Sequence, residues 1–228
     1  MKKLYRIFFI LPFLLAFSLP TLSHVQHYDG LNKIEFDIYR NNKYIGKHIF
    51  SFNKIKEELS VESEINFEIK KLGVVLYKYH VKGTEYFKEG KLIKFNSKTN
   101  QNGKKKYVNL YLDGEELVID GSSFKGKVST DYLLGTWWNH SIVESPAQIS
   151  AVSGRIIKQK VTFLGKETIK INNKVYEALH FNFSSTDKGL SKDKRLNTDV
   201  WYDEKSLNWI KATFNKKGKW EYRLTTIE

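Results

Sequence analysis

Alternating apolar and polar residues run through most of the chain and predict β-strands. The clearest stretch extends from Leu59 to Ile69, where every second side chain is apolar or small and Ser, Glu or Asn stands between. The pattern resumes from Val75 to Val81 after a turn near residues 71–73. A period of two places the apolar side chains on one face of a half-buried strand. Two neighbours of about ten residues exceed the usual five or six and favour a barrel or curved sheet.

Turn residues divide the rest of the chain into further hairpins. Asn41-Asn42, Asn102-Gly103, Asp113-Gly114 and Asn172-Asn173 are turn signals, because Asn, Asp and Gly tolerate positive φ. Gly46, inside a predicted strand, indicates a bulge or the close approach of another backbone. The remaining predicted strands cover residues 34–38, 44–52, 92–99, 104–112, 116–120, 124–128, 155–164, 167–171, 175–183, 198–203, 209–215 and 220–225.

This pattern predicts an all-β fold in which a single large antiparallel meander of roughly ten to twelve strands forms a curved half-barrel or barrel. The alternation stops only from Ser129 to His140, where two of the five tryptophans stand side by side. Thr130 or Asp131 has the chemistry of a helix N-cap, and Ser145 with Pro146 can start a second helix. We therefore predict one or two short helices around residues 130–150, inserted as a lid or plug.

The N-terminus has the pattern of a secretory signal. Lys2, Lys3 and Arg6 precede an apolar stretch over residues 7–17, and Ser23 offers a cleavage position. The apolar stretch is shorter than the about 20 residues of a comfortable membrane span. We predict a signal peptide over residues 1–23 and a single β-barrel-like domain over residues 24–228 that is not transmembrane after cleavage. The alternative is an uncleaved N-terminal anchor.

Composition excludes some chemistry and leaves the partner open. The chain has no cysteine, which removes disulfides, thiolate catalysis, cysteine zinc sites and lipid attachment to cysteine. The net charge is +13, and residues 1–23 account for three of these charges. A basic surface can attract nucleic acid, anionic lipid or acidic glycan. Only five of the 38 basic residues are Arg and the lysines are spread over solvent-facing positions, so we interpret the charge as a generic basic surface; export argues against nucleic acid.

Enzyme signatures are missing from the sequence. It contains neither an HExxH nor a GxSxG motif. Glu62, Glu64 and Glu68 share one strand face, where paired carboxylates can act on glycosidic bonds. Their regular alternation with apolar residues instead favours a solvated outer face. We predict a protein that is not an enzyme and has no cofactor.

A copper site is one alternative considered for the N-terminus. Cleavage after Ser23 would expose the amine and imidazole of His24, and His27 could add a ligand. A frayed polar terminus accounts for the same residues more simply, and we predict no metal site.

Six residues are candidates for ligand binding. Aromatic rings in the irregular insert can stack on a sugar or cover a lipid chain, and polar neighbours can orient the ligand. The alternatives are that one tryptophan plugs the core while the other packs on the surface, and that the polar residues satisfy turn backbone. The candidates are Tyr132, Trp137, Trp138, Asn139, His140 and Trp201.

Several short motifs together resemble a known family. They are Phe36–Arg40 with Gly46, Trp138-Asn139, Leu164–Thr168, Asp199–Glu204, Trp209–Lys211 and Glu221–Leu224. As a set they resemble an uncharacterised family of exported proteins of Gram-negative, mainly alphaproteobacterial, bacteria that is classed as a domain of unknown function. The resemblance implies a periplasmic, β-rich protein and supplies no catalytic residues. Related exported families are similar to the half-barrels of periplasmic lipoprotein carriers, which hold acyl chains under a helical lid.

These observations lead to three hypotheses. The first is a non-enzymatic periplasmic protein that binds an apolar or amphipathic ligand, such as a lipid, in the barrel interior, with a basic rim suited to anionic head groups. The second is an envelope scaffold or accessory module with a filled barrel that binds another protein. The third is a glycan-binding or glycan-active protein.

Overall fold

The computed structural model describes Tyr28, residues 30–191 and residues 194–228. The predicted signal peptide (residues 1–23) lies outside these residues, and so do His24 and His27. Within the described part of the chain, no helix is long and apolar enough to cross a membrane.

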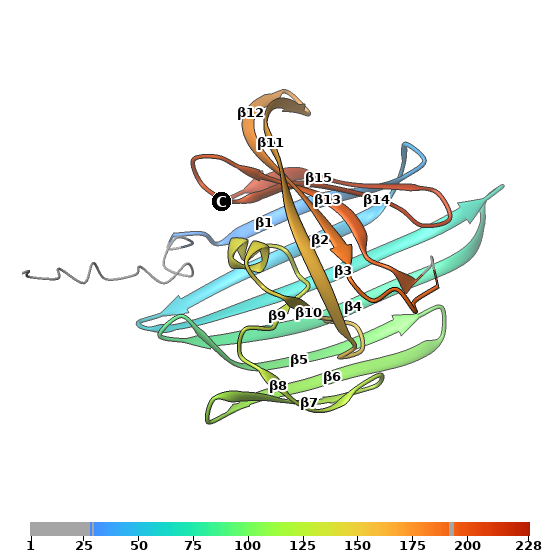
Figure 1. The fold of residues 1–228 in the computed structure, drawn as a ribbon. Coiled ribbons are helices and arrows are strands. Elements are labelled where there is room, and N and C mark those ends of the chain that lie inside the picture. Colours follow the sequence, from blue (N-terminus) through green and yellow to red (C-terminus); the bar gives the residue numbers. More distant parts are fainter. Residues whose placement is uncertain (1–27, 29, 192–193) are drawn as a thin grey trace, which may run out of the picture.

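Fifteen strands form one sheet, and each strand pairs with its neighbours in the order β8-β7-β6-β5-β4-β3-β2-β1-β15-β14-β13-β12-β11-β10-β9 (Figure 1). All pairs are antiparallel except β9 with β10. The strands are β1 Lys33–Arg40, β2 Lys43–Ile55, β3 Glu58–Lys71, β4 Val74–Lys88, β5 Lys91–Gln101, β6 Lys104–Asp113, β7 Glu116–Gly121, β8 Lys125–Ser129, β9 Leu133–Leu134, β10 Ala147–Ile149, β11 Ile156–Ile171, β12 Lys174–Ser185, β13 Asn197–Asp203, β14 Trp209–Asn215 and β15 Lys219–Ile227. The predicted all-β, mainly antiparallel architecture is confirmed.

The strand count of ten to twelve is too low: the predicted ranges themselves number fourteen, and the described residues form fifteen strands. β9 and β10 have two and three residues, too few to carry a detectable alternation. In the other direction, residues 155–164 and 167–171 were predicted as two strands, whereas β11 is one strand of 16 residues. A register shift between Phe163 and Gly165 bends β11 without ending it, so the glycine marks a bulge and not a turn.

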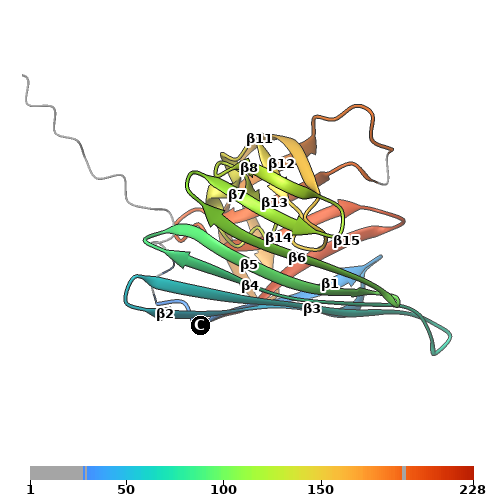
Figure 2. The same cartoon turned by 90° about the horizontal axis from the view of Figure 1, so that it is seen from below.

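The sheet curls around the insert that follows β8 and does not close (Figure 2). One core cluster joins the concave sides of β1 to β3 and β11 to β15, and its largest buried side chains include Phe36, Phe50, Tyr202 and Trp209. A second cluster lies under β5 to β7 and packs against Leu134 and Ile149 of the insert. The insert therefore lies inside the curl.

The helices predicted for the insert are almost absent. It contains only a 3₁₀ turn, η2 (His140–Val143), between the short strands β9 and β10. The side chains that suggested helix caps serve turns and strand ends instead. The Ser145 hydroxyl lies 2.6 Å from the carbonyl oxygen of Asp131 and 2.7 Å from that of Ala147, and so ties the two ends of the insert together.

Gly46 confirms the predicted bulge and close approach. The register of β1 and β2 shifts beside it, where Ile38 pairs with Gly46 but Tyr39 pairs with Tyr44. A Cβ atom on Gly46 would lie 2.1 Å from the carbonyl oxygen of Asn66 and 2.6 Å from Cα of Phe67. β2 and β3 can come together at this point only because residue 46 has no side chain.

Candidate functional site

The two adjacent tryptophans of the insert have different environments. Trp138 is fully buried in the first core cluster, and its ring contacts Tyr28, Phe52 and Phe87 edge to face. Its indole N–H donates a 2.8 Å hydrogen bond to the Glu85 carboxylate. Trp138 therefore plugs the interior and is not available to a ligand.

Trp137 is half-buried and has a left-handed backbone, with φ of 59°. A bulky residue rarely adopts this conformation, and it persists only where surrounding contacts enforce it. The Tyr202 hydroxyl donates a 3.0 Å hydrogen bond to the Trp137 carbonyl oxygen, and the Trp137 ring packs edge to face on Trp209 at 5.6 Å. These contacts aim the indole away from its buried neighbour.

Trp137 forms part of a pocket of about 480 Å³, which we call the mouth pocket. Its apolar lining consists of Trp137, Ile157, Leu196 and Phe214. Four cationic side chains complete the lining together with Asn197, Thr198 and Asn215; they are Arg155, Lys194, Arg195 and Lys216. Among the described residues, no carboxylate lines the pocket and none pairs with these four cations.

The wall of the mouth pocket is fixed by the β14–β15 hairpin. Phe214 stacks on Trp220 with ring centres 5.6 Å apart and planes 10° from parallel. The Trp220 indole N–H donates to the carbonyl oxygen of Lys216 at 2.9 Å. The apolar wall and the turn that carries Lys216 are thus held together.

The two arginines of the pocket differ in how strongly their guanidinium groups are hydrogen-bonded within the protein. Arg195 donates to the carbonyl oxygens of Leu190 and Lys188 at 2.7 and 2.8 Å, so it shapes its own loop. Arg155 makes two longer contacts of 3.3 Å with the carbonyl oxygen of Lys194. Arg155, Lys194 and Lys216 therefore keep donors for an anion.

Tyr132 and Asn139 line a different pocket, of about 600 Å³, next to the β5 and β7 strand ends. Asn139 caps η2, and its side-chain oxygen accepts a 3.0 Å hydrogen bond from the Ser141 backbone N–H. His140 packs its ring edge-on against Tyr202 at 4.7 Å, and its backbone N–H donates to the Tyr28 hydroxyl. Asn139 thus has the turn-satisfying role that the sequence analysis gave as the alternative.

Trp201 lies on the opposite face of the sheet. Successive residues of a strand point to opposite faces, so the inward Val200 and Tyr202 put Trp201 on the convex side. There its ring stacks on His180 at 4.1 Å, its indole N–H donates to the Glu167 carboxylate, and Lys211 Nζ lies 4.9 Å from the ring centre. The six candidate residues therefore do not form one site.

A carboxyl group and an imidazole, those of Glu85 and His48, are buried on the concave face. Burial raises the pKa of Glu85 to about 7, against the lowering effect of the hydrogen bond from Trp138. Burial lowers the pKa of His48 to about 3, so this imidazole is neutral at physiological pH. His48 Nε2 lies 2.9 Å from the Ser63 hydroxyl among aromatic rings. Both groups lie in the packed interior, which makes them structural elements of the core.

The sequence analysis missed the cationic lining of the mouth pocket. Lys194 and Lys216 look like ordinary loop residues between predicted strands, and Arg155 is the first residue of the strand predicted over 155–164. The scarcity of Arg was a usable signal, because two of the five arginines meet in this pocket. Among the described residues, no group of three His, Asp or Glu side chains is arranged to hold a metal ion.

A single curled and unclosed antiparallel sheet around an internal plug defines a β-barrel-like protein. The family model "Domain of unknown function (DUF6134)" matches residues 36–225, and the chain belongs to this family. Membership in a family of unknown function confirms that part of the predicted resemblance. Among functionally curated proteins, none is detectably similar in sequence.

Two solved structures are similar to the chain. The first is a β-barrel-like protein of the domain of unknown function DUF1849 from Brucella abortus, with a TM-score of 0.61 at 8% identity, covering 87% of this chain and 97% of that one. This likeness shows the fold alone. The second is a DUF1329 family protein from Desulfovibrio piger, with 12% identity over 90% of this chain and 89% of that one; its TM-score of 0.19 is too low to show a shared fold.

Proposed function

We propose that the protein is a non-enzymatic binding protein for an anionic amphipathic molecule, which it takes up in the mouth pocket. The observation that carries the proposal is the composition of this pocket: apolar side chains that include Trp137 and Phe214, the cations Arg155, Lys194 and Lys216, and no carboxylate among the described residues of the lining. An apolar body and a negative head group match these two parts. Ligand pockets commonly combine apolar surface with a few convergent polar groups.

The position of the ligand differs from the interior site expected from the sequence. Trp138, Trp209, Tyr202, Phe36 and Phe50 are among the largest fully buried side chains, and they fill the concave side. The volume of about 480 Å³ lies at the low end of the range for small-molecule sites. A single acyl chain or a similar small amphipath suits this space better than a two-chain lipid.

The proposal includes export to the periplasm. Lys2, Lys3 and Arg6 before the apolar residues 7–17 support it on sequence grounds. Envelope compartments contain anionic single-chain and two-chain lipids, which agrees with the chemistry of the pocket. The intact mass of the protein recovered from the periplasm of a Gram-negative host tests the cleavage after Ser23.

A scaffold function is the second candidate, and the packed interior favours it. In that case the mouth pocket would accept a side chain or terminus of a partner protein. The glycan hypothesis loses its main support, because Trp138 is buried and cannot form an exposed pair with Trp137.

Titration with lysolipids below their critical micelle concentration tests the binding function. We expect lysophosphatidylglycerol to bind the wild-type protein at least tenfold more tightly than lysophosphatidylcholine, because only the former is a net anion. Trp137→Ala removes a large apolar side chain from the pocket lining and is expected to weaken binding at least tenfold. Lys216→Glu reverses one charge of the lining and should weaken binding severalfold, whereas the matched variant Lys219→Glu, outside the pocket on the same hairpin, should bind like wild type.

Calorimetry gives the affinities, and the ligand-induced change in the total tryptophan emission reports on occupancy. Absence of lysophosphatidylglycerol binding, or equal binding by Trp137→Ala, would overturn the proposal and leave the scaffold hypothesis.

A further inference from the structure

The β3–β4 hairpin projects beyond the strands on either side of it. β2 pairs with β3 only as far as Gly46 with Phe67, and β5 pairs with β4 only as far as Tyr79 with Gln101. β3 and β4 remain paired with each other out to Lys71 and Val74. Residues 68–78, which we call the hairpin tip, therefore form a two-stranded ribbon that pairs with no further strand among the described residues and extends past the sheet in Figure 1. Asn102 of the β5–β6 turn hydrogen-bonds only to its base, at Lys78.

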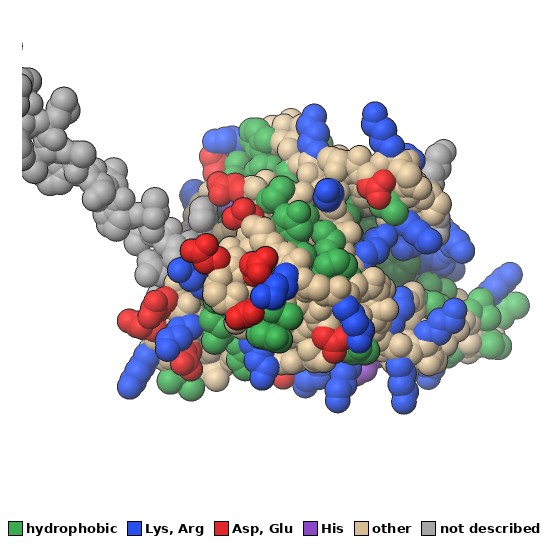
Figure 3. All heavy atoms as spheres, turned by 60° about the horizontal axis from the view of Figure 1, so that its bottom comes forward, with side chains coloured by type: hydrophobic (Ala, Val, Ile, Leu, Met, Phe, Trp, Pro, Cys, Tyr) green, Lys and Arg blue, Asp and Glu red, His purple; other side chains and the backbone are tan. Residues whose placement is uncertain are grey.

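Apolar side chains cover this ribbon on the outside. Leu72 is 95% exposed, Val74 61% and Leu76 55%. A register shift between Ile69 and Lys70 leaves Leu76 as an extra residue in β4. In Figure 3 the projecting end carries hydrophobic side chains bordered by Lys or Arg. Contiguous exposed apolar residues of this kind mark interaction surfaces.

Leu72 also occupies an unfavourable backbone position. Its φ is 49°, in the left-handed region, and Gly73 follows at 79°. At the corresponding position of other two-residue turns the chain has Asn41, Glu89 or Asn172, all polar. Asn would suit this turn better than Leu, both in conformation and in solvation. The fold itself gains nothing from Leu72, which indicates that this side chain contacts something outside the molecule.

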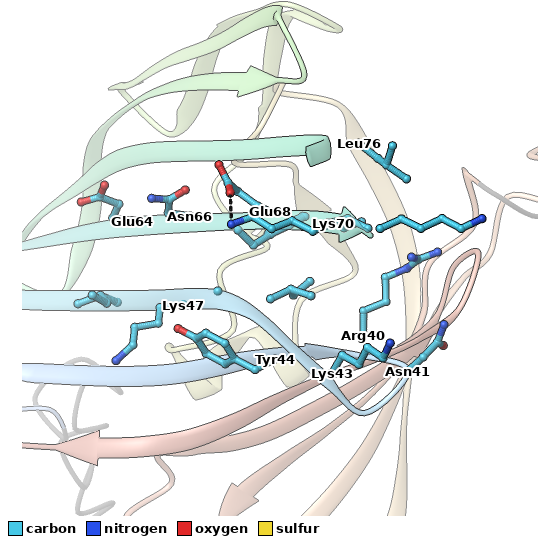
Figure 4. A pocket seen from close by; sticks show the side chains of 16 residues that line it. Arg40, Asn41, Lys43, Tyr44, Lys47, Glu64, Asn66, Glu68, Lys70 and Leu76 are labelled. Atoms are coloured by element: carbon cyan, nitrogen blue, oxygen red, sulfur yellow. Dashed lines mark ion pairs between the residues drawn. The ribbon is translucent and has the colours of Figure 1, made fainter. Parts of the chain in front are cut away.

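A cationic groove runs beside the hairpin tip. Beyond Gly46 the strands β2 and β3 separate, and the space between them, about 940 Å³, is the fork groove (Figure 4). Its cations are Arg40, Lys43, Lys47, Lys70 and Lys71, against the carboxylates Glu64 and Glu68. Lys47 pairs with Glu35 and Lys70 with Glu68. Among the described residues, Arg40, Lys43 and Lys71 form no ion pair with a carboxylate.

We propose that the hairpin tip and the fork groove form a docking site for an anionic lipid bilayer. Leu72, Val74 and Leu76 enter the boundary between head groups and acyl chains, and the groove cations contact the head-group phosphates. Insertion of exposed apolar side chains combined with attraction of lysines to anionic lipids is the general basis of peripheral membrane binding. The charge of the groove selects an anionic bilayer over a zwitterionic one.

The docking site lies at the same end of the molecule as the mouth pocket. Asn41, in the β1–β2 turn, accepts a hydrogen bond from the Lys219 backbone N–H at 2.9 Å. Arg40 of the fork groove lies over the Trp220 ring, which stacks on Phe214 of the mouth pocket. A docked protein would therefore present its mouth pocket close to the membrane surface. The docking inference rests on different residues and holds whether or not the pocket takes a ligand.

Flotation with lipid vesicles tests the docking site. We expect wild type to bind vesicles of phosphatidylcholine with phosphatidylglycerol, and to bind phosphatidylcholine vesicles at least tenfold less. The variant Leu72→Ser/Val74→Ser/Leu76→Ser should lose at least tenfold in binding, and Lys43→Glu/Lys71→Glu should lose binding and its dependence on salt. Ile55→Ser/Val175→Ser is the matched control, because these apolar side chains are each 64% exposed near other hairpin turns.

Site-specific labelling separates insertion from a general effect of the substitutions. The chain has no cysteine, so Leu72→Cys and Ile55→Cys each accept one environment-sensitive fluorophore. The label at residue 72 should shift to the blue on anionic vesicles, and the label at residue 55 should not. The proposal would be overturned if wild type did not bind anionic vesicles, or if the triple serine variant bound them as well as wild type. Equal fluorescence shifts at residues 72 and 55 would also overturn it. Far-UV circular dichroism checks that the variants are folded.

Discussion

The indole N–H of Trp138 donates to the carboxylate of Glu85, 53 residues earlier in the chain, at 2.8 Å. Both side chains are buried, so the bond joins the insert to the C-terminal part of β4 inside the curl. A buried polar atom that loses its partner costs more than the bond itself contributes. This single contact therefore gives the insert a fixed position against the sheet.

Replacing Trp138 by Phe is expected to reduce the free energy of unfolding by about 3 kcal/mol, from the lost hydrogen bond and the space left by the smaller ring. Urea denaturation measures the effect. Trp137→Phe is the matched control: the indole N–H of Trp137 is buried without a hydrogen-bond partner among the described residues, so no bond is lost and the loss should be about 1 kcal/mol or less. Equal losses in the two variants would contradict a specific role of the Glu85 contact.

Glu85 and His48 should have opposite effects on the pH dependence of stability. The pKa of Glu85 is about 7 in the folded protein against an ordinary 4.5, so its stabilising contribution is present below pH 4.5 and is lost as the pH rises to about 7. The pKa of His48 is about 3 against 6.5, so its contribution is gained as the pH rises from about 3 to 6.5. Between about pH 4.5 and 6.5 the two slopes offset each other.

Glu85→Gln removes one of these slopes. We expect its free energy of unfolding to rise by about 3 kcal/mol between pH 4.5 and 6.5, while wild type changes little over the same window. Glu64→Gln, on the solvated face beside His80, should behave like wild type. Urea denaturation across this pH window measures the slopes. A flat profile for Glu85→Gln would show that His48 does not titrate as its burial requires, and a wild-type profile as steep as that of Glu85→Gln would show the same of Glu85.

The strands could be predicted because each has one face in the core, which forces the alternation of Leu59 to Ile69 and its neighbours. The structure of the insert could not be predicted, because residues 130–150 show no regular alternation of apolar and polar side chains. Asp131 and Ser145 are compatible with helix caps and with turns alike, and only the packing around them decides. For the same reason the sequence could not assign which of the adjacent tryptophans is buried.

The mouth pocket was beyond sequence analysis for a different reason. Trp137, Arg155, Leu196 and Phe214 come from four segments far apart in the chain. Their meeting depends on how far the sheet curls, and curl is set by bulges and by the packing of the insert rather than by local pattern. The hairpin tip is the opposite case, since Leu72 in a turn and the excess length of β3 and β4 are both visible in the sequence.

Gly46 controls the point where β2 and β3 separate, and its substitution tests how tightly this geometry is defined. A Cβ atom there would meet the backbone of Asn66 at 2.1 Å and of Phe67 at 2.6 Å, and backbone atoms in a paired strand cannot move aside as a flexible side chain can. Gly46→Ala must therefore shift the β2–β3 register or widen the fork, and we expect it to lower the free energy of unfolding by about 3 kcal/mol.

Gly189→Ala is the matched control for this substitution. Gly189 lies in a loop, and the nearest atom to an added Cβ is the Asp187 side-chain oxygen at 3.3 Å, so the change should stay within about 0.5 kcal/mol. Urea denaturation of both variants measures the difference. If Gly46→Ala were as stable as Gly189→Ala, the two strands would have to accommodate a side chain at their contact. The fork would then be a flexible opening and not a groove with fixed walls, and the arrangement of cations that favours anionic lipid would lose its geometric basis.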